Sequence, residues 1–355
     1  MSEKLFFYFG DNLFKKLDEL YLDFDVKDCQ SSFYKAFNSL KNNPHLPITN
    51  VYLGWSFLLL NANEQIFRTG GFGETEQNSL IVPTLQNISN ISCGLDKILL
   101  KTINGDCYYG LNGNFKPKLI KFATSNVVVQ QVCVGDVISC ALSSDGEVFS
   151  VCFDEKFPSN LLPMRWIICE VACGKEHVLL LSDSGQVISF GNGSRGQLGH
   201  GNIENIDAPK LLESLDGIVV KNIAAGGWHS AAISGEGDLY MWGWNESGQL
   251  GFPCNEVHEH ILPKEEIETI CCLPKFLEFQ NDNNVLKVSC GSRHTACITE
   301  DHQVWTWGWN GYGQLGHEKQ IICDKPEKIS LPENVVPEDI TCNLWSTLVT
   351  GTLKK

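Results

Sequence analysis

Residues 172–199 read ACGKEHVLLLSDSGQVISFGNGSRGQLG, and this stretch decides the fold because the chain contains it three times. Residues 224–251 read AAGGWHSAAISGEGDLYMWGWNESGQLG, and residues 289–316 read SCGSRHTACITEDHQVWTWGWNGYGQLG. In each copy a histidine lies three residues after the first glycine, and another glycine lies 17 residues after that first glycine. Each copy ends in Gly-Gln-Leu-Gly. Self-similarity of this kind is the signature of a repeat architecture.

Weaker copies complete the series. They begin at Leu53-Gly54-Trp55, at Cys93-Gly94-Leu95, at Val134-Gly135-Asp136 and at Thr341-Cys342-Asn343. The last copy lacks its second half, but Phe7-Tyr8-Phe9-Gly10 at the other terminus matches Trp305-Thr306-Trp307-Gly308. A repeat divided between the two ends closes a ring and leaves no exposed sheet edge.

Each repeat has the pattern of short strands. Residues 178–181 form a continuous apolar run, and a glycine-containing turn separates them from a second run at residues 186–190. Two such runs predict a hairpin, and continuous apolarity predicts that both faces of the sheet are covered. We therefore predict an all-β fold, a seven-bladed β-propeller whose last blade is closed by the N-terminal strand.

The repeats divide a single domain, residues 1–355. The predicted parts are a strand completing the last blade (1–12), three degenerate blades (51–153), two well-formed blades (171–251), an acidic insertion between blades (252–286), a well-formed blade (288–317) and the start of the closing blade (340–355). Leucines at partly helical spacing between residues 13 and 50 fit either a short helix or degenerate outer strands.

The repeats resemble those of the regulator of chromosome condensation family, strongly over residues 171–251 and 288–317 and weakly over residues 51–153. The sequence has no Trp-Asp dipeptide, which argues against a WD-type propeller. Similarity to the compact members of the family implies a nuclear, chromatin-associated binding protein that is the partner of a JmjC-type 2-oxoglutarate oxygenase. The founding member implies an alternative, a guanine-nucleotide exchange factor for a small GTPase. A third role, an ultraviolet-B sensor, requires successive Gly-Trp-Arg-His loops, which this chain lacks.

The candidate binding residues are those that vary within the repeat. His177, His229 and His294 recur in separate blades and are expected to be structural, with hydrogen bonds to loop backbone. The two residues after each first glycine vary instead, and equivalent loops should place them together on one face. Large side chains in loops on a rigid scaffold are common binding determinants. The protein-binding candidates are Trp55, Trp228, Arg293, Trp345, Lys175, Glu176 and Asp136. Packing of the tryptophans into neighbouring loops is an equal alternative.

The charge of the chain constrains its partners. Its 355 residues contain 27 Lys and Arg against 42 Asp and Glu, a net charge of −15. This disfavours direct nucleic-acid binding and permits a basic partner such as a histone. Residues 252–286 carry −5 of this charge, and Glu265, Glu266 and Glu268 are candidates for an acidic interaction loop. Cys254, His258 and His260 lie in the same stretch, but without a second matching cluster we expect no metal and no cofactor.

No catalytic motif is present. The sequence lacks Gly-x-x-x-x-Gly-Lys, His-Glu-x-x-His and Gly-x-Ser-x-Gly, so we expect a protein without enzymatic activity. It also lacks a targeting segment and an apolar run long enough to span a membrane. Fifteen cysteines, an odd number within apolar runs, indicate reduced thiols in the cytosol or the nucleus. The resemblance implies a nuclear location, with the cytoplasm as a second compartment.

Overall fold

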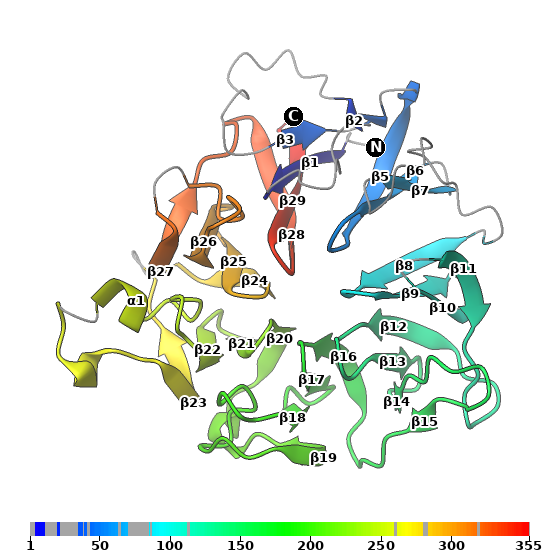
Figure 1. Cartoon of the computed structure of the whole chain (residues 1–355), viewed down its shortest axis with the longest axis horizontal. Coiled ribbons are helices and arrows are strands. Elements are labelled where there is room, and N and C mark those ends of the chain that lie inside the picture. Colours follow the sequence, from blue (N-terminus) through cyan, green and yellow to red (C-terminus); the bar gives the residue numbers. More distant parts are fainter. Residues whose placement is uncertain are drawn as a thin grey trace.

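The chain forms a ring of seven β-sheets around a central axis, as the computed structural model shows (Figure 1). The structure describes residues 4–10, 20–21, 35–37, 39–40, 43–62, 65–69, 85, 87–111, 114–258, 261–279, 283–317 and 320–354. The ring confirms the predicted all-β, seven-bladed propeller. Within the described ranges, no helix is both long and apolar enough to cross a membrane.

The blades follow one another along the chain and are numbered here from the first complete sheet. Blade 1 contains β2 (Leu20–Tyr21), β4 (Ser39–Leu40), β5 (Asn43–Leu53), β6 (Leu58–Ala62) and β7 (Gln65–Thr69); blade 2 contains β8 (Ile88–Cys93), β9 (Lys97–Thr102), β10 (Cys107–Leu111) and β11 (Asn114–Leu119); blade 3 contains β12 (Val129–Cys133), β13 (Cys140–Ser143), β14 (Val148–Ser150) and β15 (Asn160–Leu161). Blade 4 contains β16 (Ile168–Cys173), β17 (His177–Ser182), β18 (Val187–Gly191) and β19 (Ile206–Leu211); blade 5 contains β20 (Val220–Ala225), β21 (His229–Ser234), β22 (Leu239–Trp244) and β23 (Ile270–Leu277); blade 6 contains β24 (Val285–Cys290), β25 (His294–Thr299), β26 (Val304–Trp309) and β27 (Ile322–Ile329). The helices are α1 (Asn255–His258) and two 3-10 turns, η1 (Glu213–Leu215) and η2 (Lys264–Glu266).

Blade 7 joins the two ends of the chain. Its strands run in the order β28 (Val335–Asn343), β29 (Ser346–Leu353), β1 (Lys4–Phe9) and β3 (Lys35–Phe37), and β1 pairs antiparallel with β29. Phe9 takes the place that Trp242 and Trp307 hold in other blades, since each of these rings packs against the last glycine of the preceding repeat. The N-terminal strand therefore closes the last blade, as predicted.

The hydrophobic core is divided into seven layers, each between two neighbouring blades. Strand β1 illustrates the principle, because Phe6 and Tyr8 pack towards blade 1 while Leu5, Phe7 and Phe9 pack towards blade 6. Successive side chains of a strand point to opposite faces, so a strand between two neighbouring blades is buried on both faces and is predominantly apolar. All six residues of β17 are buried for this reason.

One stretch differs from its sequence-based interpretation, and in a second the structure favours one of two alternatives that the sequence left open. Residues 270–277 fall in the predicted insertion 252–286, yet they form β23, the outer strand of blade 5. Its apolar pattern is interrupted because β23 is an edge strand that tolerates Pro274 and exposes half of its side chains. In the stretch 13–50, the described residues form short strands, which favours the second of the two alternatives for these residues.

Candidate functional site

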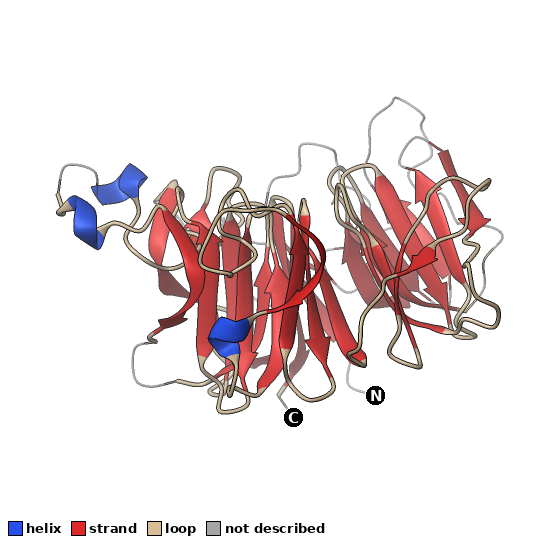
Figure 2. Ribbon diagram, turned by 90° about the horizontal axis from the view of Figure 1, so that it is seen from below, coloured by secondary structure: helices blue, strands red, loops and turns tan. Residues whose placement is uncertain are grey.

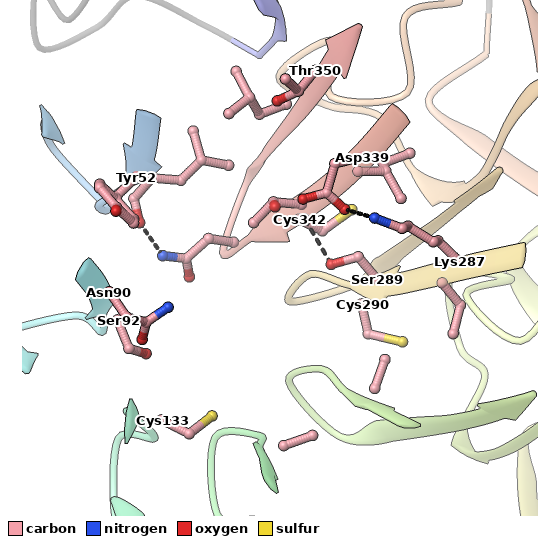
Figure 3. A pocket seen from close by; sticks show the side chains of 18 of the residues that line it. Tyr52, Asn90, Ser92, Cys133, Lys287, Ser289, Cys290, Asp339, Cys342 and Thr350 are labelled. Carbon is pink, nitrogen blue, oxygen red and sulfur yellow. Dashed lines mark hydrogen bonds and ion pairs between the residues drawn. The ribbon is translucent and has the colours of Figure 1, made fainter. Parts of the chain in front are cut away.

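The Gly-x-x loops converge around one end of an axial channel. The channel has a volume of about 1030 Å³ and lies between the innermost strands of the blades (Figure 3). At one mouth, loops from six blades contribute Gly94, Gly135, Gly174, Gly226, Gly291 and Leu344. Asp136 and Lys175 lie at this mouth, and their side chains pair at 3.9 Å. Burial raises the pKa of Asp136, and the Lys175 ammonium opposes this rise.

The repeated histidines join neighbouring blades. Nε2 of His177 bonds to the Ser230 hydroxyl at 2.9 Å, and Ser230 in turn donates to the carbonyl of Gln197. His229 bonds to Thr295 and His294 to Thr347 in the same way. Burial lowers the pKa of each ring to about 3, so all three are neutral near pH 7. Their role is structural, and the loop backbone is reached through a hydroxyl rather than directly.

Cations and tryptophans alternate along this face. Lys175 lies over the Trp228 ring at 4.6 Å, and Arg195 lies over both Trp228 and Trp244, at 4.5 and 4.6 Å. The two indole rings meet edge to face at 5.4 Å. A cation over an aromatic face is held by the ring quadrupole, worth about 0.5–1 kcal/mol at exposed sites. Trp228 is half-buried, so it both packs into neighbouring loops and contributes to the surface.

Arg293 continues the series onto blade 6. Its guanidinium lies over Trp244 at 4.6 Å and 3.8 Å from the Glu246 carboxylate. Glu256, at the start of the acidic excursion, lies in the same electrostatic environment. Burial and the Glu246 carboxylate raise the pKa of Glu256, while Arg293 lowers it. The region therefore has both signs of charge within a few residues.

An aromatic triad follows on blades 6 and 7. Trp345 packs against Trp309 at 5.0 Å and Tyr312 at 6.0 Å, and Trp309 contacts Tyr312 at 5.1 Å. Tyr312 is 41% exposed. We call the combined set the aromatic–cation arc, which comprises Asp136, Lys175, Arg195, Trp228, Trp244, Glu246, Arg293, Trp309, Tyr312 and Trp345.

The arc contains five residues that sequence reasoning did not select, namely Arg195, Trp244, Glu246, Trp309 and Tyr312. Arg195 and Tyr312 precede Gly196 and Gly313 of the Gly-Gln-Leu-Gly element, at a position that varies between repeats. Applying the criterion of variation within the repeat to this second loop would have identified them. Each covers the tryptophan of the next blade, Trp228 or Trp345.

The remaining candidates occupy other positions. Trp55 lies half-buried in the β5–β6 loop of blade 1, and the carbonyl of Glu176 accepts a bond from the backbone of Asn192. Glu265 and Glu266 are exposed on η2, and half-buried Glu268 pairs with Lys275. The two short helices of this excursion lie at the edge of the ring, on the face away from the termini (Figure 2).

The suggested metal ligands do not meet as a group. His258 pairs with Asp324 of blade 6 at 2.9 Å, and Cys254 is buried with its backbone amide bonded to the same carboxylate. His260 and Glu259 lie outside the described residues. In the part of the chain that is described, no group of three or more His, Cys, Asp and Glu side chains has a geometry that could hold a metal ion.

Comparison with known proteins agrees with this architecture. A family described as "RCC1-like domain" matches residues 110–352, which is more than half of the chain. The chain belongs to the RCC1-like domain family. Human RCC1 domain-containing protein 1 is 39% identical over 207 residues, which cover 51% of this chain and 55% of that protein. The ultraviolet-B receptor UVR8 of Arabidopsis thaliana is 30% identical over 267 residues, which cover 68% and 58%.

These alignments span little more than half of the length of each relative. Among solved structures, Prp20p from Saccharomyces cerevisiae superposes with a TM-score of 0.79 at 17% identity, covering 100% of this chain and 93% of that one. The Prp20p structure is described together with its binding to Gsp1p and histones. At 17% identity the similarity to Prp20p establishes only the fold of this chain.

Proposed function

We propose that this RCC1-like propeller is a non-catalytic protein-interaction module that binds its partner through the aromatic–cation arc. The observation that carries the proposal is the series of aromatic and cation contacts from Lys175 to Trp345, in which Trp228, Trp309 and Trp345 are half-buried and Trp244 is buried beneath Arg195 and Arg293. Tryptophan and arginine are enriched at interface hot spots: tryptophan buries a large area with few rotatable bonds, and arginine combines stacking with several hydrogen-bond donors. Pre-packed rings also reduce the entropy lost on binding.

The finer identity of the partner follows from the family resemblance. We propose a nuclear, chromatin-associated location and a JmjC-type 2-oxoglutarate oxygenase as the partner. The acidic side chains of Glu246 in the arc and of Glu256 beside it favour a second, basic ligand such as a histone segment, and exposed Glu265 and Glu266 on η2 add negative charge to the same excursion. The net charge of −15 supports a basic ligand rather than a nucleic acid.

Affinity purification from nuclear extract with mass spectrometry identifies the partner, and titration of purified components then tests the surface. Trp228→Ala combined with Arg293→Ala should weaken binding about 100-fold, as expected for loss of two hot-spot side chains. Ile167→Ser is the matched control, because Ile167 is 57% exposed in the inter-blade connection that contacts Gly146 of a β13–β14 turn, away from the arc. A double variant that keeps its melting temperature and its full affinity would refute the proposal.

Guanine-nucleotide exchange on a small GTPase is the alternative, and the fold it shares with Prp20p, which is described with Gsp1p, favours it. It is tested by release of a fluorescent nucleotide from nuclear GTPases. If the wild type accelerates nucleotide release and the Trp228→Ala, Arg293→Ala variant does not, the protein is an exchange factor and the non-catalytic proposal is wrong. Binding without release supports it.

A further inference from the structure

One hydrogen bond between blades recurs beside the channel, and in one place a sulfur atom replaces the oxygen. The residue two positions before the first glycine accepts a bond from a backbone amide of the next blade. Ser92 Oγ accepts from Val134 at 2.9 Å, and Ser289 Oγ accepts from Cys342 at 2.8 Å. Between blades 3 and 4 the acceptor is Cys133 Sγ, 3.0 Å from the amide nitrogen of Cys173.

At this contact between blades 3 and 4, which we call a seam, the donor residue is itself a cysteine. The Cys173 thiol donates to the carbonyl of Cys133 at 3.5 Å, so each of these residues bonds to the other. Both side chains are partly exposed on the channel wall, where Cys133 points towards the open space (Figure 3). Cys140, the cross-strand partner of Cys133, is fully buried behind them. Small molecules in the channel can therefore reach Cys133 and Cys173 before Cys140.

The surroundings give the two thiols different chemistry. Hydrogen bonding to Cys173 lowers the pKa of Cys133, against the effect of burial. Burial and the neighbouring sulfur atoms raise the pKa of Cys173. A thiol that ionises readily beside a second thiol is the arrangement of redox-responsive pairs, in which the first reacts with an oxidant and the second resolves the product.

We propose that Cys133 and Cys173 form an oxidisable dithiol that a hydroperoxide converts into a disulfide between blades 3 and 4. The Cys133 thiolate attacks the peroxide, the O–O bond breaks, and Cys133 sulfenic acid forms. The leaving hydroxide takes up the proton lost by Cys133. The Cys173 sulfur then attacks the sulfenic sulfur, the S–O bond breaks, and the second hydroxide leaves as water with the Cys173 proton. Two thiols lose two electrons, and one hydrogen peroxide becomes two waters.

The test is mass spectrometry of the full chain treated with hydrogen peroxide, after blocking free thiols by alkylation under denaturing conditions. Trypsin with Asp-N and Glu-C cuts between Cys133 and Cys140 and between Cys169 and Cys173, which assigns the link unambiguously. We expect a Cys133–Cys173 peptide that is lost on treatment with dithiothreitol. Cys342, whose seam has Ser289 as acceptor, should remain alkylated and serves as an internal control.

Variants separate this pairing from other outcomes. Cys133→Ser reproduces the serine of the equivalent seams, so it should fold with an unchanged melting temperature and form no link. Cys140→Ala should retain the link. The proposal is overturned if peroxide oxidises exposed Cys169 while Cys133 and Cys173 both stay alkylated. It is equally overturned if the link involves Cys140 or if Cys133 proceeds to sulfinic acid without a disulfide.

Discussion

Neighbouring blades meet at seams, and two groups of seams use different chemistry. One group joins blades 4, 5, 6 and 7, and the other joins blade 1 to blade 2 and blade 3 to blade 4. Histidine meets a hydroxyl in three consecutive seams, as His177 meets Ser230. In the equivalent places Phe57 packs in one cluster with Ile98, and Ile138 packs in one cluster with Val178. Polar pairs with polar in these three seams and apolar with apolar in these two, so no buried polar group is left against an apolar one at either kind of seam.

This comparison explains why part of the repeat is degenerate in sequence and regular in structure. The Gly-x-x-His spacing exists because the imidazole folds back over its own glycine, where a Cβ at Gly226 would collide with the ring of His229. In blades 1 to 3, where the histidine is absent, the glycine persists, since a Cβ at Gly54 would collide with the Phe57 ring, so the motif loses only its histidine while the blade keeps its sheet. Weak repeats thus indicate a different seam chemistry rather than a missing blade.

Acid should destabilise the seams that contain histidine much more than the apolar seams, and this is the largest expected difference between them. We call His177, His229 and His294, which join neighbouring blades, the clamp histidines. The pKa of each falls from 6.5 to about 3 on folding. Between these values the unfolded chain binds more protons, so stability is full above pH 6.5 and is lost as the pH falls. Each histidine costs about 2 kcal/mol at about pH 5, about 6 kcal/mol for the three. Hydrogen exchange at pH 5 and 7 should show loss of protection in β17, β21 and β25 first; equal loss in β9 and β13 would contradict the comparison.

Removing one clamp histidine should reduce the free energy of unfolding by less than acid does. The reduction should still exceed that caused by substituting Lys97, which holds the equivalent place in blade 2. His229→Ala leaves a cavity and removes one of the two hydrogen bonds of the Thr295 hydroxyl, and we expect a loss of about 3 kcal/mol in the free energy of unfolding. Lys97→Ala is the matched control, since partly exposed Lys97 reaches the Asp136 carbonyl and the Phe153 ring, and its loss should cost less than about 1 kcal/mol. Urea unfolding measures both, and equal losses would show that the clamp is not the source of stability.

A double-mutant cycle can convert an apolar seam. Ile138→His and Val178→Ser should each destabilise the protein, because each buries a polar group against an apolar one. Together they recreate the pair of His177 and Ser230, and we expect a favourable coupling of about 1–2 kcal/mol. Additive costs in thermal or urea unfolding would mean that the surrounding backbone, and not the pairing, selects the seam chemistry.

Glu170 provides the smallest test, in the opposite pH direction. Gln131 bonds both the amide and the carbonyl of Val171, whereas Glu170 at the next seam accepts from Asn222 at 2.9 Å. Burial raises the pKa of Glu170 to about 7, so its contribution is present at low pH and is lost as the pH rises through 7. From about pH 6.5 to 8.5 the wild type should lose about 1 kcal/mol through this group. Glu170→Gln should remove that loss, and an unchanged pH profile would contradict the assignment.

The sequence determined the ring itself. The spacing of glycine, histidine and the second glycine is local to one hairpin, and the divided repeat at Phe7–Gly10 and Thr341–Asn343 allows only a closed arrangement. These constraints can be read directly because the spacing recurs in every well-formed copy, and the two halves of the divided copy can be matched to complete ones. The sequence also selected Lys175, Trp228, Arg293 and Trp345 as variable positions.

The tertiary structure decided which of these side chains meet. Arg195 covers Trp228, and Cys133 faces Cys173, only because neighbouring blades are rotated about a common axis that brings loops some 30 to 40 residues apart into contact. That rotation is set by the packing of the inter-blade core, to which every strand contributes. No single repeat contains this information, so the arc and the dithiol seam could be identified only from the assembled ring.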